Sequence, residues 1–352
     1  MPRSGAPSST ASSPRAFRTA IRTGAPPTCA SRWRSWTGAL AGAERAVPRR
    51  PVVVLGPTAA GKSEIALQVA RRIRAEIVGA DSRQIYQGLE IGTAAPSERD
   101  RAVAPHHLAS FLPPGESYSA GRYAREARVA IDGILTRGGT ALVVGGSGLY
   151  LRALLDGLFE GPGRDEGIRA RLQERLSREG LPALRAELER VDPEAHSKIL
   201  GADAVRVIRA LEVHELTGKP ITALRRERRR APLPAIRFGI RWPRPILALR
   251  IASRIQDQLR DGFLDQARAL LAAGLPADAP GVQTLGYREL LAHLRGESSL
   301  ESAVETIALR TRQLSKRQET WFRKVEDVVW LDLESPEQFP DVARTIASRI
   351  DS

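Results

Sequence analysis

One eight-residue segment constrains the fold of this chain more than any other. Residues 56–63 read G-P-T-A-A-G-K-S, which matches the pattern G-x-x-x-x-G-K-[ST]. The run before it, Val52 to Leu55, is apolar, as in a strand buried on both faces of a parallel sheet, and a helical pattern begins at Gly61. A glycine-rich turn between a strand and a helix points backbone N–H groups at an anion. The segment therefore predicts a phosphate-binding loop made of Gly56, Pro57, Thr58, Ala59, Ala60, Gly61, Lys62 and Ser63.

Two side chains of this phosphate loop carry the expected chemistry. Lys62 supplies a full positive charge to the bound phosphate groups. The Ser63 hydroxyl is placed to bind a Mg²⁺ ion that bridges those groups. We therefore expect a phosphorylated substrate and Mg²⁺ as the cofactor.

Short apolar runs alternate with helical stretches along most of the chain. The further strands that we expect are Glu76 to Ala80, His106 to Ser110, Thr140 to Val144, Ile236 to Arg241 and Val328 to Leu331. Alternation of this kind is typical of a doubly wound α/β fold. We expect a parallel sheet of the P-loop NTPase type, flanked by helices.

This alternation is interrupted between residues 163 and 230. Three helical stretches, Asp165 to Glu179, Pro182 to Arg190 and Asp203 to Thr217, follow one another there without a strand signal. We therefore expect a helical insertion domain at 163–230 and an α/β core formed by 49–162 and 231–352.

The first 48 residues differ from the rest in composition. They are rich in Ser, Pro, Ala, Gly and Arg, and residues 1–50 hold nine arginines and one glutamate, a net charge of +8 out of +14 for the chain. Because they show no sustained apolar period, we expect a disordered N-terminal extension at 1–48. An organelle transit peptide and a wrongly chosen start codon are the two alternatives.

Composition also excludes several kinds of site. No apolar run approaches the roughly 18 to 20 residues that a membrane span needs, so we expect no membrane contact. Cys29 is the only cysteine, which excludes an internal disulfide and fits a reducing cytoplasm, where we expect the protein to act unless 1–48 is a transit peptide. The histidines lack zinc-ligand spacing. The net charge of +14 suits a polyanionic partner, although a coding bias toward Arg explains it equally well.

The ends of two expected strands bear on the type of reaction. An NTPase that drives work usually has a Mg²⁺-binding Asp at the end of such a strand, but Thr140 to Val144 is followed by G-G-S-G from Gly145. Glycines at that edge let a substrate approach the backbone closely, which favours group transfer over hydrolysis. Asp81 follows Glu76 to Ala80 and lies at the same edge, where it can accept a proton from a nucleophile or join the Mg²⁺ ligands. The alternative is that Asp81 caps a helix.

Several longer motifs occur in order along the chain. They are D-S-R-Q-I-Y-Q-G-L-E-I-G-T-A-A-P from Asp81, P-H-H-L from Pro105, G-G-S-G-L-Y-L-R-A-L-L-D-G-L from Gly145, R-V-I-R-A-L-E-V from Arg206, T-L-G-Y-R from Thr284 and K-R-Q-E-T-W-F-R from Lys316. Together with the phosphate loop they cover about residues 51–335. In this order they resemble the tRNA dimethylallyltransferase (tRNA isopentenyltransferase) family.

The resemblance implies a reaction. A dimethylallyl group moves from dimethylallyl diphosphate to the exocyclic N6 amine of adenosine 37 in tRNAs that read codons beginning with U, and diphosphate is released. By resemblance, Asp81 is the general base at N6, Arg254 faces the diphosphate, and Ser63 with Mg²⁺ completes the catalytic groups. The adenine is expected to flip out of the anticodon loop into a channel.

The resemblance also implies residues that contact the tRNA anticodon stem-loop. Asp81, Ser82, Arg83 and Gln84 would read the flipped base. The other expected contacts are Ser147, Arg169, Val205, Arg206, Val207, Ile208, Arg209, Gln283, Thr284, Leu285, Gly286, Tyr287, Arg288, Lys316, Arg317, Gln318, Glu319, Thr320, Trp321, Phe322 and Arg323. Ser147 stands where the family usually has Thr, and Ala95 where it commonly has Lys.

The last of these motifs lies on a helix that can be read from its own pattern. Ser298-x-x-Glu301 is typical of a capping box at a helix start. Val304, Ile307, Leu314, Trp321 and Val325 then share one face, which we expect to be core. Arg312, Lys316 and Arg323 project roughly opposite, spaced to follow a phosphate backbone.

Three alternative functions remain. A small-molecule kinase would combine the phosphate loop with a Gly-Gly turn and consume ATP. An isopentenyltransferase acting on free adenine nucleotides would not need the helical insertion or the basic helix. A non-catalytic RNA-binding protein would use the phosphate loop only to dock an anion. By resemblance we expect a monomer.

Overall fold

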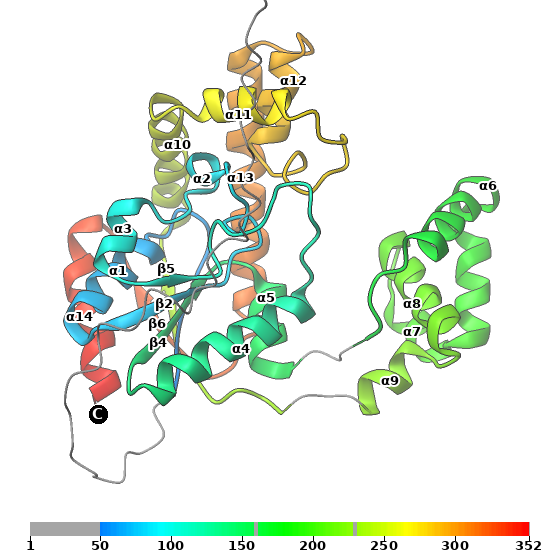
Figure 1. Cartoon of the computed structure of the whole chain (residues 1–352), viewed down its shortest axis with the longest axis horizontal. Helices are drawn as coiled ribbons and strands as arrows, with labels where there is room; N and C mark the ends of the chain where they lie inside the picture. The colour runs from blue at the N-terminus through cyan, green and yellow to red at the C-terminus, as the bar shows by residue number, and fades with distance from the viewer. Residues whose placement is uncertain (1–49, 158–160, 228–230, 352) are drawn as a thin grey trace, which may run out of the picture. The chain divides into compact units, whose positions relative to one another are not determined.

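The computed structural model describes residues 50–157, 161–227 and 231–351. They contain a six-stranded, all-parallel sheet with the order β3-β2-β4-β1-β5-β6 (Figure 1). The strands are β1 (Val52–Leu55), β2 (Ala75–Gly79), β3 (His106–His107), β4 (Thr140–Gly145), β5 (Ile236–Arg241) and β6 (Val328–Asp332). The predicted parallel α/β fold is therefore confirmed. The prediction for residues 1–48 lies outside the described residues.

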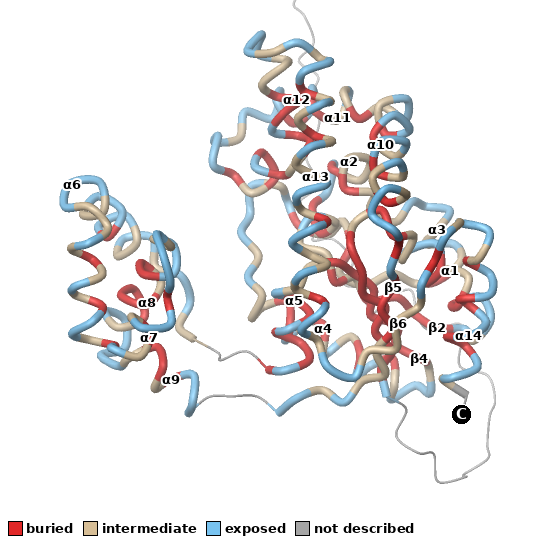
Figure 2. The backbone as a smooth tube through the Cα atoms, turned by 180° about the vertical axis from the view of Figure 1, so that it is seen from behind, coloured by how far each residue is buried: buried red, intermediate tan, exposed pale blue. Residues whose placement is uncertain are grey.

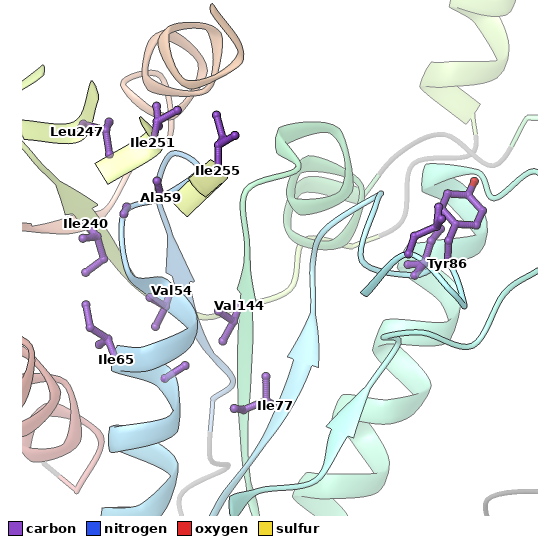
Figure 3. Packing of buried hydrophobic residues seen from close by; sticks show 14 of the residues in the cluster. Val54, Ala59, Ile65, Ile77, Tyr86, Val144, Ile240, Leu247, Ile251 and Ile255 are labelled. Carbon is purple, nitrogen blue, oxygen red and sulfur yellow. The ribbon is translucent and has the colours of Figure 1, made fainter. Parts of the chain in front are cut away.

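Helices cover both faces of the sheet. One face packs against α1 (Lys62–Ile73), α10 (Arg244–Arg260) and α14 (Phe339–Asp351), and the other against α4 (Ala120–Thr136) and α5 (Gly148–Arg152) with the π-helical turn Ala153–Gly157. The central strands are buried along their whole length (Figure 2). Figure 3 shows Val54 and Val144 of the sheet near Ile65 of α1, and Ile251 of α10 next to Ala59. Burial on both faces explains why β1 and β4 are continuous apolar runs.

The remaining elements lie mostly beyond the carboxyl ends of the strands or between them. They are α2 (Glu90–Thr93), α3 (Glu98–Val103), α11 (Phe263–Ala272), α12 (Tyr287–Leu294), α13 (Leu300–Phe322) and the 3-10 turn Pro336–Gln338. α11 and α12 pack on the same apolar cluster as α10. Most of these helices, together with α10, lie beyond the carboxyl ends of the strands (Figure 1).

Two expected elements differ in their bounds. β3 has only two residues instead of the five expected from His106 to Ser110, because Leu108 and Ser110 adopt positive φ values of 57° and 50° and end the extended conformation. The capping box expected at Ser298 and Glu301 is wrong: the N-cap of α13 is Ser299, whose side chain accepts the Ser302 N–H.

Residues 161–227 form helices around an apolar cluster of their own. α6 (Glu166–Val191), α7 (Pro193–Lys198), α8 (Ala204–Thr217) and α9 (Ile221–Glu227) contribute to it. α6 is broken at Gly180, whose φ of 78° and ψ of 166° are not helical, so the two expected helices on either side of this residue are confirmed. The short helices α7 and α9 were not predicted, because they span less than two turns.

Two buried tyrosines allow a paired test of the core. The Tyr287 hydroxyl accepts the Gly92 N–H and donates to Gln266 Oε1, whereas the Tyr123 hydroxyl has no hydrogen-bond partner among the described residues. Tyr287→Phe leaves the Gly92 N–H without its acceptor, while Gln266 Oε1 keeps the Ile91 N–H, so we expect the free energy of unfolding to fall by about 1 to 3 kcal/mol. Tyr123→Phe should leave it unchanged or raise it. Urea unfolding of both variants checks this, and an equal loss in both would contradict it.

Candidate active site

The carboxyl ends of β1, β2 and β4 meet at one edge of the sheet. They carry the phosphate loop, Asp81 and the Gly145–Gly146 turn, and these segments border a cavity of about 670 Å³. Arg254 of α10 lies on its wall. The predicted site residues that line the cavity are Thr58, Ala59, Ala60, Gly61, Lys62, Ser63, Asp81, Gln84, Arg254 and Gln318. A crevice at this edge is where ligands of open α/β sheets bind.

The phosphate loop is held in shape from behind. Gly61 has a φ of 82°, and a Cβ there would lie 2.3 Å from the Phe339 ring, so only glycine fits. Ala59 has a φ of 63°, unusual for a residue with a side chain. Its carbonyl accepts from Arg250 Nε at 2.9 Å, and the Ala60 carbonyl accepts from Trp242 Nε1 at 3.0 Å. These contacts fix a loop conformation that its own residues do not favour.

Lys62 lies in the cavity with its ammonium 2.7 Å from the Pro57 carbonyl. Burial lowers the pKa of Lys62 to about 8, nearby Asp81 counteracts this shift, and Arg254 adds to it. Burial likewise lowers the pKa of Arg254, partly offset by Asp81. Lys62, Arg250 and Arg254 line the cavity together with several carboxylates, and an anionic ligand would stabilise the two buried cations Lys62 and Arg254.

Asp81 does not cap a helix. Its Oδ1 accepts the Arg83 N–H at 2.8 Å, and the residues after it form bends and turns until α2 begins at Glu90. The helix-cap alternative is therefore excluded. Ser147 fixes the same segment, because its Oγ accepts the Ser82 N–H at 2.8 Å. The Asp81 carboxylate is held at the cavity by this local turn.

Arg254 is positioned by the end of the short helix α2. Its Nη2 lies 3.3 Å from the Thr93 carbonyl, and Gln84 Nε2 donates to the Thr93 and Ala94 carbonyls at 3.2 and 2.8 Å. Gln258 donates to two further carbonyls of α2. The carbonyls at a helix C-terminus attract such donors. The position of the guanidinium thus depends on α2.

The glycines at the end of β4 have a packing role in addition to the one expected. A Cβ on Gly145 would lie 2.1 Å from the Ala80 carbonyl oxygen, and one on Gly148 would lie 2.5 Å from the Trp321 ring. A Cβ on Gly146 would lie 2.7 Å from Gln318 Nε2. The chain's own segments therefore approach the backbone there, and this packing requires glycine whether or not a substrate does.

The residues expected to contact tRNA differ in their exposure to solvent. Exposed side chains are Arg83, Val205, Arg206, Gln283, Arg288, Lys316, Arg317, Thr320 and Arg323; Ser82, Leu285, Glu319 and Trp321 are half-buried. Val207, Ile208, Thr284, Gly286, Tyr287 and Phe322 are buried. Side chains of the buried group act as core in this structure. The exposed group, including Lys316 and Arg323, is accessible to a polyanion.

Arg169 and Arg209 converge on a buried carboxylate. Glu212 is fully buried and binds Arg209 Nη1 at 2.8 Å, Arg169 Nη2 at 3.6 Å and the Asp165 N–H at 3.0 Å. Breaking such a pair would leave a buried charge without its partner. Arg169 and Arg209 therefore stabilise the start of α6 in addition to any contact with RNA.

Arg250 and Gln258 were missed by the sequence analysis. With Arg254 they recur every four residues and so share one face of α10, which points at the cavity. Arg250 also stacks on Trp242, with 4.5 Å from its guanidinium carbon to the ring centre. The four-residue spacing is a signal that could have identified both residues once Arg254 was assigned.

The oxygen donors at the cavity fit a hard cation bound mainly by phosphate. Ser63 and Asp81 both line the cavity and offer the ligand types that Mg²⁺ prefers. Within 50–157, 161–227 and 231–351, no group of three His, Cys, Asp or Glu side chains could hold a metal by itself. In the same residues, no helix is long and apolar enough to span a membrane.

Fold and site together define a parallel α/β protein whose predicted phosphate loop borders a cavity lined by Lys62, Asp81 and Arg254. The IPP transferase family model matches residues 84–325. The chain is 42% identical over 299 residues to the tRNA dimethylallyltransferase of Geobacter metallireducens, covering 84% of this chain and 96% of that one. It is 46% identical over 290 residues to that of Anaeromyxobacter sp., covering 80% and 92%.

Solved structures agree. The full-length tRNA isopentenylpyrophosphate transferase of Bacillus halodurans is 32% identical with a TM-score of 0.62, covering 86% of this chain and 97% of that one. A eukaryotic dimethylallyltransferase acting on tRNA is 26% identical with a TM-score of 0.73, covering 85% and 77%. The chain belongs to the IPP transferase family. The resemblance inferred from its motifs is confirmed, with the prenyl-transfer activity that it implies.

The lowered pKa of Lys62 predicts how anion binding depends on pH. Below about pH 8 Lys62 is already charged, and above it an anion must bind together with a proton. The affinity for inorganic diphosphate should then fall by about tenfold per pH unit above this point. Lys62→Arg keeps its charge over this range, so diphosphate binding should take up one proton fewer. Its affinity should therefore fall less steeply with pH than that of the unaltered protein. Calorimetry of both proteins between pH 7 and 9.5 tests this, because titration of diphosphate itself cancels in the comparison. Equal slopes would contradict the assignment.

Proposed function

We propose that this chain transfers a dimethylallyl group from dimethylallyl diphosphate to N6 of adenosine 37 in tRNA, with Asp81 as general base. The observation that carries the proposal is that Lys62, Arg254 and Asp81 line one cavity. The two buried cations Lys62 and Arg254 suit a diphosphate, and the Asp81 carboxylate suits a proton leaving an amine. The names of the related proteins support the same reaction and a tRNA acceptor.

The chemistry follows from these charges. The N6 lone pair forms a bond to the allylic carbon of the substrate, and the bond from that carbon to the diphosphate oxygen breaks. Lys62, Arg254 and the loop N–H groups stabilise the charge that grows on the departing diphosphate. The proton from N6 passes to the Asp81 carboxylate. Mg²⁺, held by Ser63, Asp81 and the phosphates, would add positive charge at the leaving group.

The acceptor must reach this cavity from the surface. N6 of a stacked adenine is not accessible to Asp81, so the base is flipped and read beside Ser82 to Gln84. Exposed Lys316 and Arg323 of α13 bind the RNA backbone, and the helices of 163–230 contact the tRNA through exposed residues such as Arg206. The protein acts as a monomer in the cytoplasm.

The direct test supplies dimethylallyl diphosphate, Mg²⁺ and unmodified tRNA with three consecutive adenosines in its anticodon loop. We expect one dimethylallyl group per tRNA, located by nuclease digestion and mass spectrometry. Parallel reactions with ATP and with AMP distinguish a kinase and a free-nucleotide transferase. ATP consumption or prenylated AMP in place of modified tRNA would contradict the proposal.

Asp81→Asn tests the base. The amide keeps the acceptor for the Arg83 N–H but cannot take the proton, so kcat should fall by about 10²- to 10⁴-fold. The Kd for tRNA should stay the same, because a base acts in the transition state more than in binding. Single-turnover kinetics and filter binding give the two values. A parallel loss of kcat and affinity would make Asp81 a binding residue instead.

A further inference from the structure

The Gln318 side chain connects three parts of the site. It extends from α13 into the cavity, where its Oε1 accepts the Thr58 N–H at 2.8 Å and its Nε2 donates to the Gly146 carbonyl at 2.8 Å. The partners fix the orientation of the amide, because an N–H can only donate and a carbonyl can only accept. One side chain therefore bridges the phosphate loop after β1 and the turn after β4.

The bridge lies where the two substrates must meet. Thr58 belongs to the loop that would hold the diphosphate, and the Gly146 turn continues into Ser147, which holds the Ser82 N–H beside Asp81. Gln318 therefore connects the loop that would hold the leaving group to the turn that adjoins the base. On the same helix, Lys316 and Arg323 are exposed to solvent.

The backbone around the Gln318 bridge is packed closely against side chains of α13. Gly146 is buried, and any side chain there would meet Gln318 Nε2. One helical turn further along, the Trp321 ring packs against Gly148, which fixes α13 on the same turn. Close contact with residues of α13 therefore explains why both positions are glycine.

Resting on the proposed reaction, we infer that Gln318 is a positioning residue that sets the distance between the diphosphate loop and the Asp81 segment. It also takes the Thr58 N–H out of the set of donors offered to the phosphates. Gln318 thereby selects which loop amides contact the leaving group. The role is distinct from contact with RNA, which the exposed cations of α13 provide.

Gln318→Met tests this inference, since it keeps the length of the side chain and removes both hydrogen bonds. A misplacement of about 1 Å can cost about 10²-fold in rate, so kcat should fall by roughly 10- to 100-fold. The Kd for tRNA should be unchanged, and the affinity for inorganic diphosphate should not weaken, because Thr58 N–H becomes free. Gln313→Met is the matched control, as Gln313 is exposed on the same helix, and it should retain the kcat of the unaltered protein.

A second route to the same bridge separates positioning from a general loss of structure. Gly146→Ala displaces the Gln318 amide without changing that residue, and its kcat loss should not add to that of Gln318→Met. Additive losses would contradict a shared bridge. A normal kcat in Gln318→Met, or a loss of tRNA affinity with kcat preserved, would overturn the inference.

Hydrogen exchange at the Thr58 amide reads the bridge without any catalysis. Exchange should be slow in the unaltered protein and in Gln313→Met, and at least tenfold faster in Gln318→Met. If the unaltered protein transfers no prenyl group, the proposed function fails while this measurement still tests the bridge. Equal exchange in all three proteins would show that Gln318 does not hold the loop.

Discussion

The burial of two cations, Lys62 and Arg254, at the carboxyl edge of the sheet is the constraint that organises this structure. Both cations lie in one cavity with Asp81, whose negative charge acts on each of them, and burial lowers the pKa of both. Charges held this way are costly until an anion arrives. The rest of the fold offsets this cost. The buried strands anchor the phosphate loop, and α10 carries Arg254 and Arg250 on one face.

Close backbone contacts hold the charged groups in register. Gly61, Gly145, Gly146 and Gly148 each lie against another segment of the chain, so the loops after β1, β2 and β4 interlock with α13 and α14. A protein interior this tightly packed transmits small displacements. The chemistry at Asp81 is therefore linked by contacts to residues such as Phe339 and Trp321, far away in sequence.

Local patterns predicted the sheet well and the site partly. The apolar runs of β1 and β4 and the phosphate loop are local signals, and each was placed within one residue. β3 was overestimated because positive φ values at Leu108 and Ser110 are not visible in a hydrophobic pattern. The cap of α13 was missed by one position because two serines are adjacent there.

The part that the sequence could not predict depends on distant contacts. Gln318 meets Thr58 and Gly146 across 260 and 172 residues, and no periodicity relates them. The packing reason for the glycines at the end of β4 could not be predicted for the same cause, since their neighbours Ala80 and Trp321 are brought near only by the fold. Asp81 was singled out from its place after an expected strand and Arg254 from the family resemblance, and both line the cavity.

The central claim is that the phosphate loop holds a leaving group and not a phosphoryl donor. Dimethylallyl diphosphate labelled with ¹⁸O at the oxygen bonded to the allylic carbon tests this most directly, with mass spectrometry of the released diphosphate and of the tRNA. If the carbon–oxygen bond breaks, all of the label appears in diphosphate and the tRNA gains only the five-carbon group. Label retained on the dimethylallyl product, or a phosphorylated acceptor, would contradict the account.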